Sequence, residues 1–249
     1  MQIDCAGWTH VGRRSHNEDC WEARPELGLF VVADGMGGYE GGEVASRCVV
    51  EAFADFCERM TKDPEATWPR RPSPGLSHEE ELLVNCTELA QRALLARRVG
   101  RLKEMGSTVV ALALGPRGAA VAHVGDSRLY RLRSGHLEQM TRDHSVLEEM
   151  REAGCEPPPR GQSPYGHYIT RALGTTRAEP TVQRVHVQAG DVYVLCSDGL
   201  YEPLGEEALA ARLAQGTARE VAQALVEAAY AAGSRDNITA VVVRVSGAA

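Results

Sequence analysis

Residues 29–38 read Leu-Phe-Val-Val-Ala-Asp-Gly-Met-Gly-Gly, and the rest of the chain is organised around this stretch. Its apolar run, mostly β-branched or aromatic, predicts a buried strand over 29–33. The strand ends at Asp34, and three glycines among the next four residues break it. A carboxylate fixed by a strand, beside a glycine whose carbonyl can turn inward, suits a hard metal ion. An Asp-Gly pair after a strand is also a common turn, so this stretch alone leaves both interpretations open.

The same pattern recurs along the chain, and its repetition favours the metal interpretation. Apolar stretches at 191–196 and 119–124 each lead into an aspartate beside a glycine, Asp198 and Asp126. Asp236 lies just before an apolar stretch at 238–245, and Glu18-Asp19 opens the segment that leads to the first strand. Because chance turns do not usually place so many acids at strand ends, we predict a polynuclear, oxygen-liganded metal site.

The ligand chemistry selects the metal. The candidate ligands are all oxygen donors, which favours Mg²⁺ or Mn²⁺ over zinc or copper. Four carboxylates around two divalent ions balance in charge, and two ions roughly 3.5–4 Å apart can activate a water and hold a phosphoryl oxygen. Arg14 lies close before these acids and could grip a phosphate with its fork, although an isolated arginine is more simply a surface residue.

Composition bounds the class of protein. The chain has 249 residues, 43% of them hydrophobic, which is ordinary for a globular protein. A net charge of −7 argues against nucleic acid as a partner and against a metal-dependent nuclease. No apolar run reaches the roughly 18–20 residues of a membrane span, and the N-terminus lacks signal-peptide features, so we expect a cytoplasmic protein without a membrane partner. The seven cysteines contain no Cys-x-x-Cys pair, so we expect reduced thiols.

Periodicity predicts one α+β domain. Helical spacing of apolar residues over 41–60 and a capping-box start at Ser77 predict a pair of long helices. Helical patterns at about 206–215 and 217–232 predict a second pair. Between and around them lie short strands joined by short turns, which favours antiparallel neighbours, in stretches at 3–11, 20–24, 29–33, 107–114, 119–124, 129–132, 136–140, 180–187, 191–196 and 238–245. A short helix at 145–153 precedes a proline- and glycine-rich excursion over 154–168. Two sheets packed face to face with helices outside would fit this order.

Eight motifs in register resemble the type 2C family of metal-dependent protein phosphatases, and the bacterial branch in particular. The match covers essentially the whole chain. The motifs are Arg14-x-x-Asn17-Glu18-Asp19, Ala33-Asp34-Gly35-Met36-Gly37-Gly38, Gly106-Ser107-Thr108, Val124-Gly125-Asp126-Ser127-Arg128, Thr141-x-Asp143-His144-Ser145, Ile169-Thr-Arg-Ala-Leu-Gly174, Cys196-Ser-Asp198-Gly199 and Asp236-Asn237-Ile238-Thr239.

The resemblance implies a fold and a set of roles. The expected fold is a four-layer α-β-β-α sandwich of two antiparallel sheets flanked by helix pairs, forming one catalytic domain over 1–249 with a flap at about 145–168. Glu18 resembles the residue that holds metal-bound water, and Arg14 the phosphate-binding arginine. Asp126 and Asp198 resemble a weaker third metal site of bacterial members. The ligands of the two central ions, Mn²⁺ or Mg²⁺, would be Asp19, Asp34, Asp198 and Asp236, with the carbonyl of Gly35.

The expected activity is that of a serine/threonine phosphoprotein phosphatase in which a metal-bridging hydroxide attacks phosphorus. Its substrates would be proteins phosphorylated by a bacterial serine/threonine kinase, and we expect a monomer. No cysteine stands in a Cys-x₅-Arg loop, which argues against a covalent tyrosine-phosphatase mechanism. A competing interpretation is a catalytically weak or regulatory binding protein on the same fold. Met36 replaces the histidine that animal members use as general acid, and the flap segment Pro157-Pro-Pro-Arg160-Gly-Gln162 departs from the family pattern.

Overall fold

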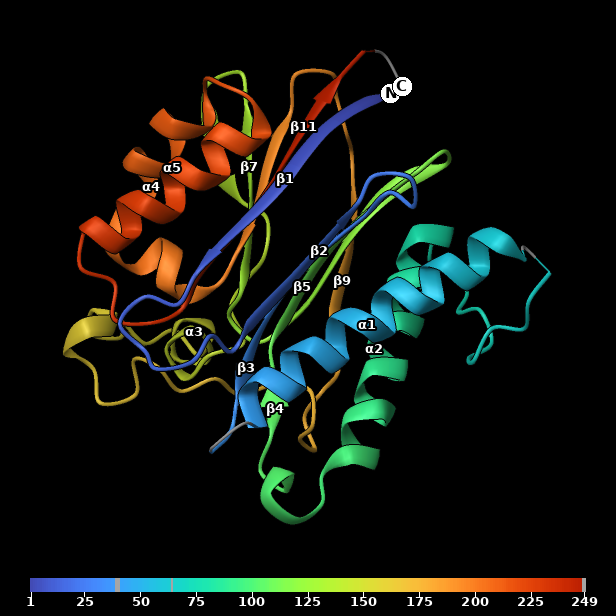
Figure 1. The fold of residues 1–249 in the computed structure, drawn as a ribbon, viewed down its shortest axis with the longest axis horizontal. Helices are drawn as coiled ribbons and strands as arrows, with labels where there is room; N and C mark the ends of the chain where they lie inside the picture. Colours follow the sequence, from blue (N-terminus) through green and yellow to red (C-terminus); the bar gives the residue numbers. More distant parts are fainter. Residues whose placement is uncertain (39–40, 64, 248–249) are drawn as a thin grey trace.

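Two antiparallel sheets form the centre of the molecule in this computed structural model, which describes residues 1–38, 41–63 and 65–247 (Figure 1). The first sheet has the strand order β1-β11-β10-β7-β8. Its strands are β1 (Gln2–His10), β11 (Ile238–Ser246), β10 (Val192–Cys196), β7 (Arg128–Arg133) and β8 (His136–Gln139). Pairing of β1 with β11 brings the two ends of the described chain together.

The second sheet has the order β2-β3-β5-β6-β9, with a short strand β4 paired to β3. Its strands are β2 (Asp19–Arg24), β3 (Leu29–Met36), β4 (Gly106–Ser107), β5 (Val109–Gly115), β6 (Gly118–Val124) and β9 (Thr181–Val185). Every ladder of both sheets is antiparallel, as the short connections predicted. Ser134 and Gly135 join β7 to β8 with positive φ at both positions, the geometry of a tight hairpin.

A helix pair covers the outer face of each sheet (Figure 1). The pair α1 (Gly41–Lys62) and α2 (His78–Arg97) packs on the second sheet, and η1 (Gly100–Leu102) follows it. The capping box predicted at Ser77 is present, with reciprocal hydrogen bonds to Glu80. The pair α4 (Asp198–Leu213) and α5 (Ala218–Ala231) packs on the first sheet.

The core forms three apolar layers, one between the sheets and one under each helix pair. In β3, Leu29 and Val31 face the helices, whereas Phe30 and Val32 face the opposite sheet. Both faces of this strand are therefore buried, which explains why it reads as a continuous apolar run. The predicted four-layer sandwich is confirmed.

One helix begins earlier than the sequence predicted. The helix expected from about 206 is the second part of α4, which begins at Asp198 and is interrupted at Gly205, where φ is 70° and ψ is 163°. Pro203 cannot donate to the carbonyl of Gly199, and the hydroxyl of Ser234 donates to that carbonyl instead, at 2.8 Å. This long-range partner stabilises a helical turn that local propensity disfavours.

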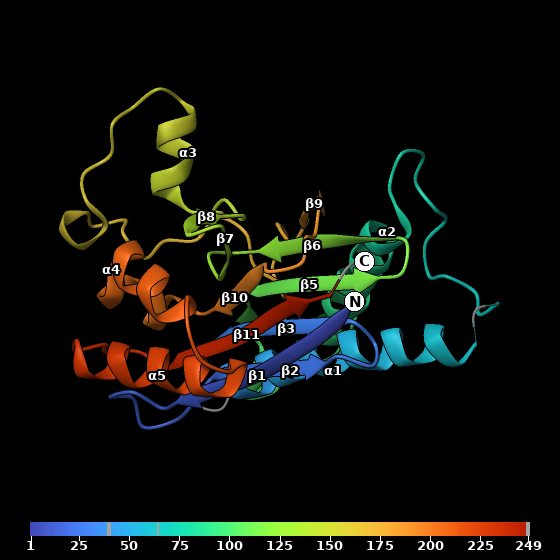
Figure 2. The same cartoon turned by 90° about the horizontal axis from the view of Figure 1, so that it is seen from above.

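The expected flap segment contains α3 (Val146–Glu152) and the single turn η2 (Arg160–Gln162). Figure 2 shows α3 and the chain after it standing away from the sheets, on the side of α4. Among the residues that the structure describes, no helix combines the length and apolar character needed to cross a membrane.

Candidate metal centre

The predicted acids converge at one end of the two sheets. Asp19 and Asp34 are register partners on the adjacent strands β2 and β3 of the second sheet. Oδ2 of Asp19 accepts hydrogen bonds from Ser197 Oγ and Thr239 Oγ1 of the first sheet's side, each at 2.7 Å. These two bonds hold the acid in one orientation and tie the sheets together where the site lies. The sequence alone predicted no role for Ser197 or Thr239.

The remaining acids reach the same cleft from other strand ends. Asp126 follows β6, Asp198 follows β10, and Asp236 precedes β11. A cleft of about 1150 Å³ is lined by Asp34, Asp126, Asp198 and Asp236, among other residues. The topology therefore gathers acids that lie more than 200 residues apart in sequence, as their shared position at strand ends predicted.

Burial raises the pKa values of the carboxylates of Asp19, Asp34 and Asp198. Desolvation, followed by repulsion from Asp19 and the other acids, raises the pKa of Asp34 well above its ordinary value. The same causes, burial first and then Asp126, raise the pKa of Asp198. The pKa of Asp19 rises to about 6, mainly through burial, against its two hydrogen bonds. Bound cations would stabilise the ionised form of such a cluster, because they offset the repulsion between the buried carboxylates.

Two buried oxygens point to ligation of a cation. Oδ1 of Asp19 and Oδ1 of Asp198 are buried and have no hydrogen-bond partner among the described residues. An unpaired buried carboxylate oxygen costs free energy unless a donor or a cation satisfies it. Because the available donors are carboxylates and backbone carbonyls, the site suits Mg²⁺ or Mn²⁺.

Glycines at positions 35 and 42 allow the backbone to pack closely against itself and against Glu18. A Cβ atom on Gly35 would lie 1.9 Å from the carbonyl oxygen of Gly42, so no side chain fits there. A Cβ on Gly42 would lie 2.3 Å from Oε1 of Glu18. Glu18 accepts a hydrogen bond from the backbone of Gly42, and burial raises its pKa. The start of α1 thus holds Glu18 at the edge of the cleft.

Arg14 lies at the mouth of the cleft and donates from Nη2 to Oδ2 of Asp236 at 2.7 Å. Its side chain is 57% exposed, so part of the guanidinium faces solvent. Asn237 anchors this turn, because its amide nitrogen donates to the carbonyls of Val11 and His16. The predicted phosphate-binding arginine is therefore held next to the predicted metal ligands.

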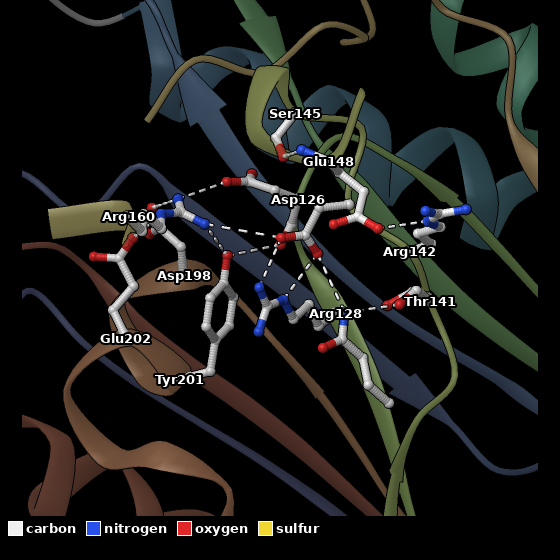
Figure 3. A network of polar contacts seen from close by, with 12 residues as sticks. Asp126, Arg128, Thr141, Arg142, Ser145, Glu148, Arg160, Asp198, Tyr201 and Glu202 are labelled. Atoms are coloured by element: carbon white, nitrogen blue, oxygen red, sulfur yellow. Dashed lines mark hydrogen bonds and ion pairs between the residues drawn. The ribbon is translucent and has the colours of Figure 1, made fainter. Parts of the chain in front are cut away.

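Arg160 of the flap lies in the site, although the sequence alone did not predict it as a site residue. Its Nη2 lies 2.8 Å from Oδ2 of Asp126 and 3.4 Å from Oδ2 of Asp198 (Figure 3). Its Nε lies 2.6 Å from Oε1 of Glu202. The unusual flap composition was the only sequence signal, because these partners are 34 or more residues away.

Comparisons with known proteins identify the family to which the chain belongs. A family model described as protein phosphatase 2C matches residues 6–231. The serine/threonine protein phosphatase PstP of Mycobacterium tuberculosis is 35% identical over 233 residues, which is 93% of this chain and 43% of that protein. The chain thus spans less than half the length of this curated relative. The serine/threonine phosphatase stp of Listeria monocytogenes is 32% identical over 94% of this chain and 93% of its own length.

Solved structures of serine/threonine phosphatases have a fold similar to that of this chain. The crystal structure of Mycobacterium tuberculosis PstP/Ppp has a TM-score of 0.83 with 32% identity, covering 98% of this chain and 99% of that one. A structure of the PstP catalytic domain in complex with two manganese ions has a TM-score of 0.82, also with 32% identity and the same coverage.

Proposed function

Because this chain belongs to the protein phosphatase 2C family, we propose that it is a metal-dependent serine/threonine phosphoprotein phosphatase. The observation that carries the proposal is the convergence of four aspartates on one cleft, with Asp19 paired in register with one of them, Asp34, and with two buried carboxylate oxygens left without a partner in the described chain. Phosphorylated proteins are the substrate class, and a bacterial serine/threonine kinase would supply them. The chain is proposed to act as a cytoplasmic monomer, with 1–249 as one catalytic domain and the flap at about 145–168.

The residues fit two central Mn²⁺ or Mg²⁺ ions. Asp19, Asp34, Asp198 and Asp236 would hold them, with the carbonyl of Gly35. When bound, the ions would lower the pKa of a water and neutralise charge on the phosphoryl group. Ser197 and Thr239 hold Asp19 in place for this role. Two-manganese binding by the PstP catalytic domain supports this assignment.

Arg14 and Glu18 would act on the substrate side of the site. A guanidinium with a solvent-facing edge can bind two phosphate oxygens, and Asp236 orients it for that task. Glu18, fixed by Gly42, would orient water at the edge of the cleft. Met36 lines the same cleft and has no proton to donate, so protonation of the leaving alkoxide falls to another group. Asp126 and Asp198 would hold a third, weaker ion.

The test is hydrolysis of a phosphothreonine peptide and of p-nitrophenyl phosphate after chelation and readdition of metal. Chelation should abolish both activities, and Mn²⁺ or Mg²⁺ should restore them. Asp34→Asn and Asp236→Asn should remain inactive at high metal because each removes a ligand charge. Arg13→Ala, on the same turn as Arg14, is the matched control and should keep its activity.

This experiment also separates the enzyme from a regulatory binding protein on the same fold. A binding protein would retain affinity for the phosphopeptide but release no phosphate at any metal concentration. Full activity after exhaustive chelation would contradict the metal-dependent mechanism itself.

A further inference from the structure

The acids Asp126, Asp198 and Glu202 form a niche beside the central site, and the side chain of Arg160 fills it (Figure 3). The side chain is only 20% exposed, although it comes from the flap. Its Nη1 also donates to the hydroxyl of Tyr201 at 2.8 Å. Three acids and a phenol thus lie within 3.4 Å of the guanidinium, and a fourth acid, Asp143, lies farther away, with Oδ2 at 3.9 Å from Nη1.

Two further charged residues beside the niche, Asp143 and Arg128, form an ion pair with each other. Asp143 accepts two hydrogen bonds from Arg128, at 2.8 and 2.7 Å. The guanidinium of Arg128 stacks 3.7 Å from the ring centroid of Tyr201. The hydroxyl of Tyr201 in turn donates to the backbone carbonyl of Asp126. This support fixes the walls of the niche, while Arg160 is attached only through the flap.

The same two carboxylates, Asp126 and Asp198, would bind Arg160 and a third divalent ion. A Mn²⁺ or Mg²⁺ ion bound to Asp126 and Asp198 would lie roughly 2.0–2.2 Å from a carboxylate oxygen of each. Nη2 already lies 2.8 Å from one such oxygen and 3.4 Å from the other. Two positive groups would then be in near contact in a partly buried site, which is strongly unfavourable. An arginine cannot relieve this repulsion by losing its proton.

We propose that Arg160 is a built-in competitor of the third ion, so that the flap is docked when Arg160 fills the niche and released when the ion does. This inference rests on the proposed function, because it concerns the third ion of that site. Glu202 belongs to the niche in both states. With the flap docked, it is the ion-pair partner of Arg160 Nε. With the flap released, it would be an additional carboxylate near the ion. His167 lies 3.5 Å from the same Glu202 oxygen and links the later part of the flap to the same acid.

If Arg160 and the third ion compete, binding of the ion and release of the flap are thermodynamically linked. A site that is free for only a fraction of the time binds with an affinity reduced by that fraction. If Arg160 occupies the niche about nine-tenths of the time, its removal should tighten the third site about tenfold. The two central sites, which Arg160 contacts only through Asp198, should change much less.

The experiment is a calorimetric titration of the metal-free protein with Mn²⁺, paired with hydrogen exchange of residues 154–168. Asp126→Asn identifies which binding step is the third ion, because that step alone should disappear. Arg160→Gln should tighten the weak step about tenfold, and Arg160→Lys, which keeps the charge but loses the fork, should fall between it and the parent protein. Arg151→Gln, an exposed arginine of α3 whose partner is Glu148, is the matched control and should leave the titration unchanged.

Flap exchange provides the readout that a purely structural role would not give. In the parent protein, exchange over 154–168 should accelerate as the weak site fills, whereas in Arg160→Gln it should be fast at every Mn²⁺ concentration. A weak step within twofold of the parent value in Arg160→Gln, or flap exchange that does not accelerate with Mn²⁺, would overturn the competition while leaving the two central ions and hydrolysis intact. Failure of the parent protein to bind any Mn²⁺ would overturn the metal centre as well.

Discussion

Arg14 illustrates how a single residue acquires its role from what surrounds it. The sequence offers only an arginine a few residues before an acidic pair, which is commonly a surface residue. In the structure its guanidinium is oriented by Asp236 at the mouth of an acidic cleft, and more than half of the side chain remains exposed. The acid fixes one edge of the fork and leaves the other edge for a phosphate.

Replacing Arg14 with alanine should therefore weaken substrate binding more than turnover. Loss of a charged hydrogen bond to phosphate should lower kcat/KM about 10- to 100-fold, mainly through a higher KM. Steady-state kinetics on a phosphopeptide measure the split, with Arg13→Ala as the control. A collapse of kcat at unchanged KM would instead assign Arg14 to the transition state alone.

At the scale of elements, helices and strands that depend on local sequence patterns could be predicted. Features that depend on contacts between residues distant in the sequence could not. The apolar run of β3 and the capping box of α2 are local, and both are confirmed. The first turn of α4 was missed because it depends on Ser234 satisfying a carbonyl that Pro203 cannot. Arg160 was missed for the same reason, since its partners meet it only through the fold.

The start of α1 gives a prediction about Gly42. A methyl group there would meet Oε1 of Glu18 at 2.3 Å and must displace that carboxylate. Mutation of a residue that supports a metal ligand typically lowers metal affinity or enzyme activity by about 10- to 100-fold. We expect Gly42→Ala to raise the Mn²⁺ concentration needed for half-maximal activity by that order. Gly38→Ala is the control, because a Cβ there meets no described atom within 4 Å; equal effects of the two variants would contradict the assignment.

The base of the flap gives a prediction about pH. The His123 and His144 rings stack with centroids 4.4 Å apart, and His144 Nδ1 accepts from the backbone N–H of Gly125. Burial, then His123 and two nearby arginines, lowers the pKa of His144 to about 3.

The folded state therefore keeps His144 neutral, whereas the unfolded chain takes up a proton near pH 6.5. Stability from this site is present above that pH and is lost progressively as the pH falls toward 3. Hydrogen exchange of residues 141–146 should accelerate between about pH 6.5 and pH 4, and His144→Asn should reduce this dependence. Exchange that slows on acidification, once corrected for intrinsic rates, would contradict this account.

At the scale of the whole molecule, the sandwich gathers acids at one end and holds them rigidly between two packed sheets. Acids at strand ends could be predicted to converge, because the motif repeats at each strand end. Their mutual repulsion follows only from the packing, which buries Asp19, Asp34 and Asp198 next to one another. The metal-free fold therefore carries an electrostatic cost that bound cations would remove.

Because of this electrostatic cost, we expect the increase in Tm on metal binding to depend on pH. Because the folded-state pKa of Asp19 is about 6, against 3.8 unfolded, the metal-free folded state binds more protons and loses stability as the pH rises from about 4 to 6. Metal removes that loss at higher pH but competes with protons at lower pH. The Tm increase on adding Mn²⁺ should be larger at about pH 7.5 than at about pH 5. Differential scanning calorimetry measures both, and an equal or larger increase at the lower pH would contradict the account.

The central claim is that these acids form a dinuclear metal centre, and an anomalous difference map of a manganese-soaked crystal tests it most directly. We expect two strong peaks roughly 3.5–4 Å apart, ligated by Asp19, Asp34, Asp198 and Asp236, with any third peak weaker and next to Asp126. A cleft without a peak, or a single ion bound away from Asp34, would contradict it.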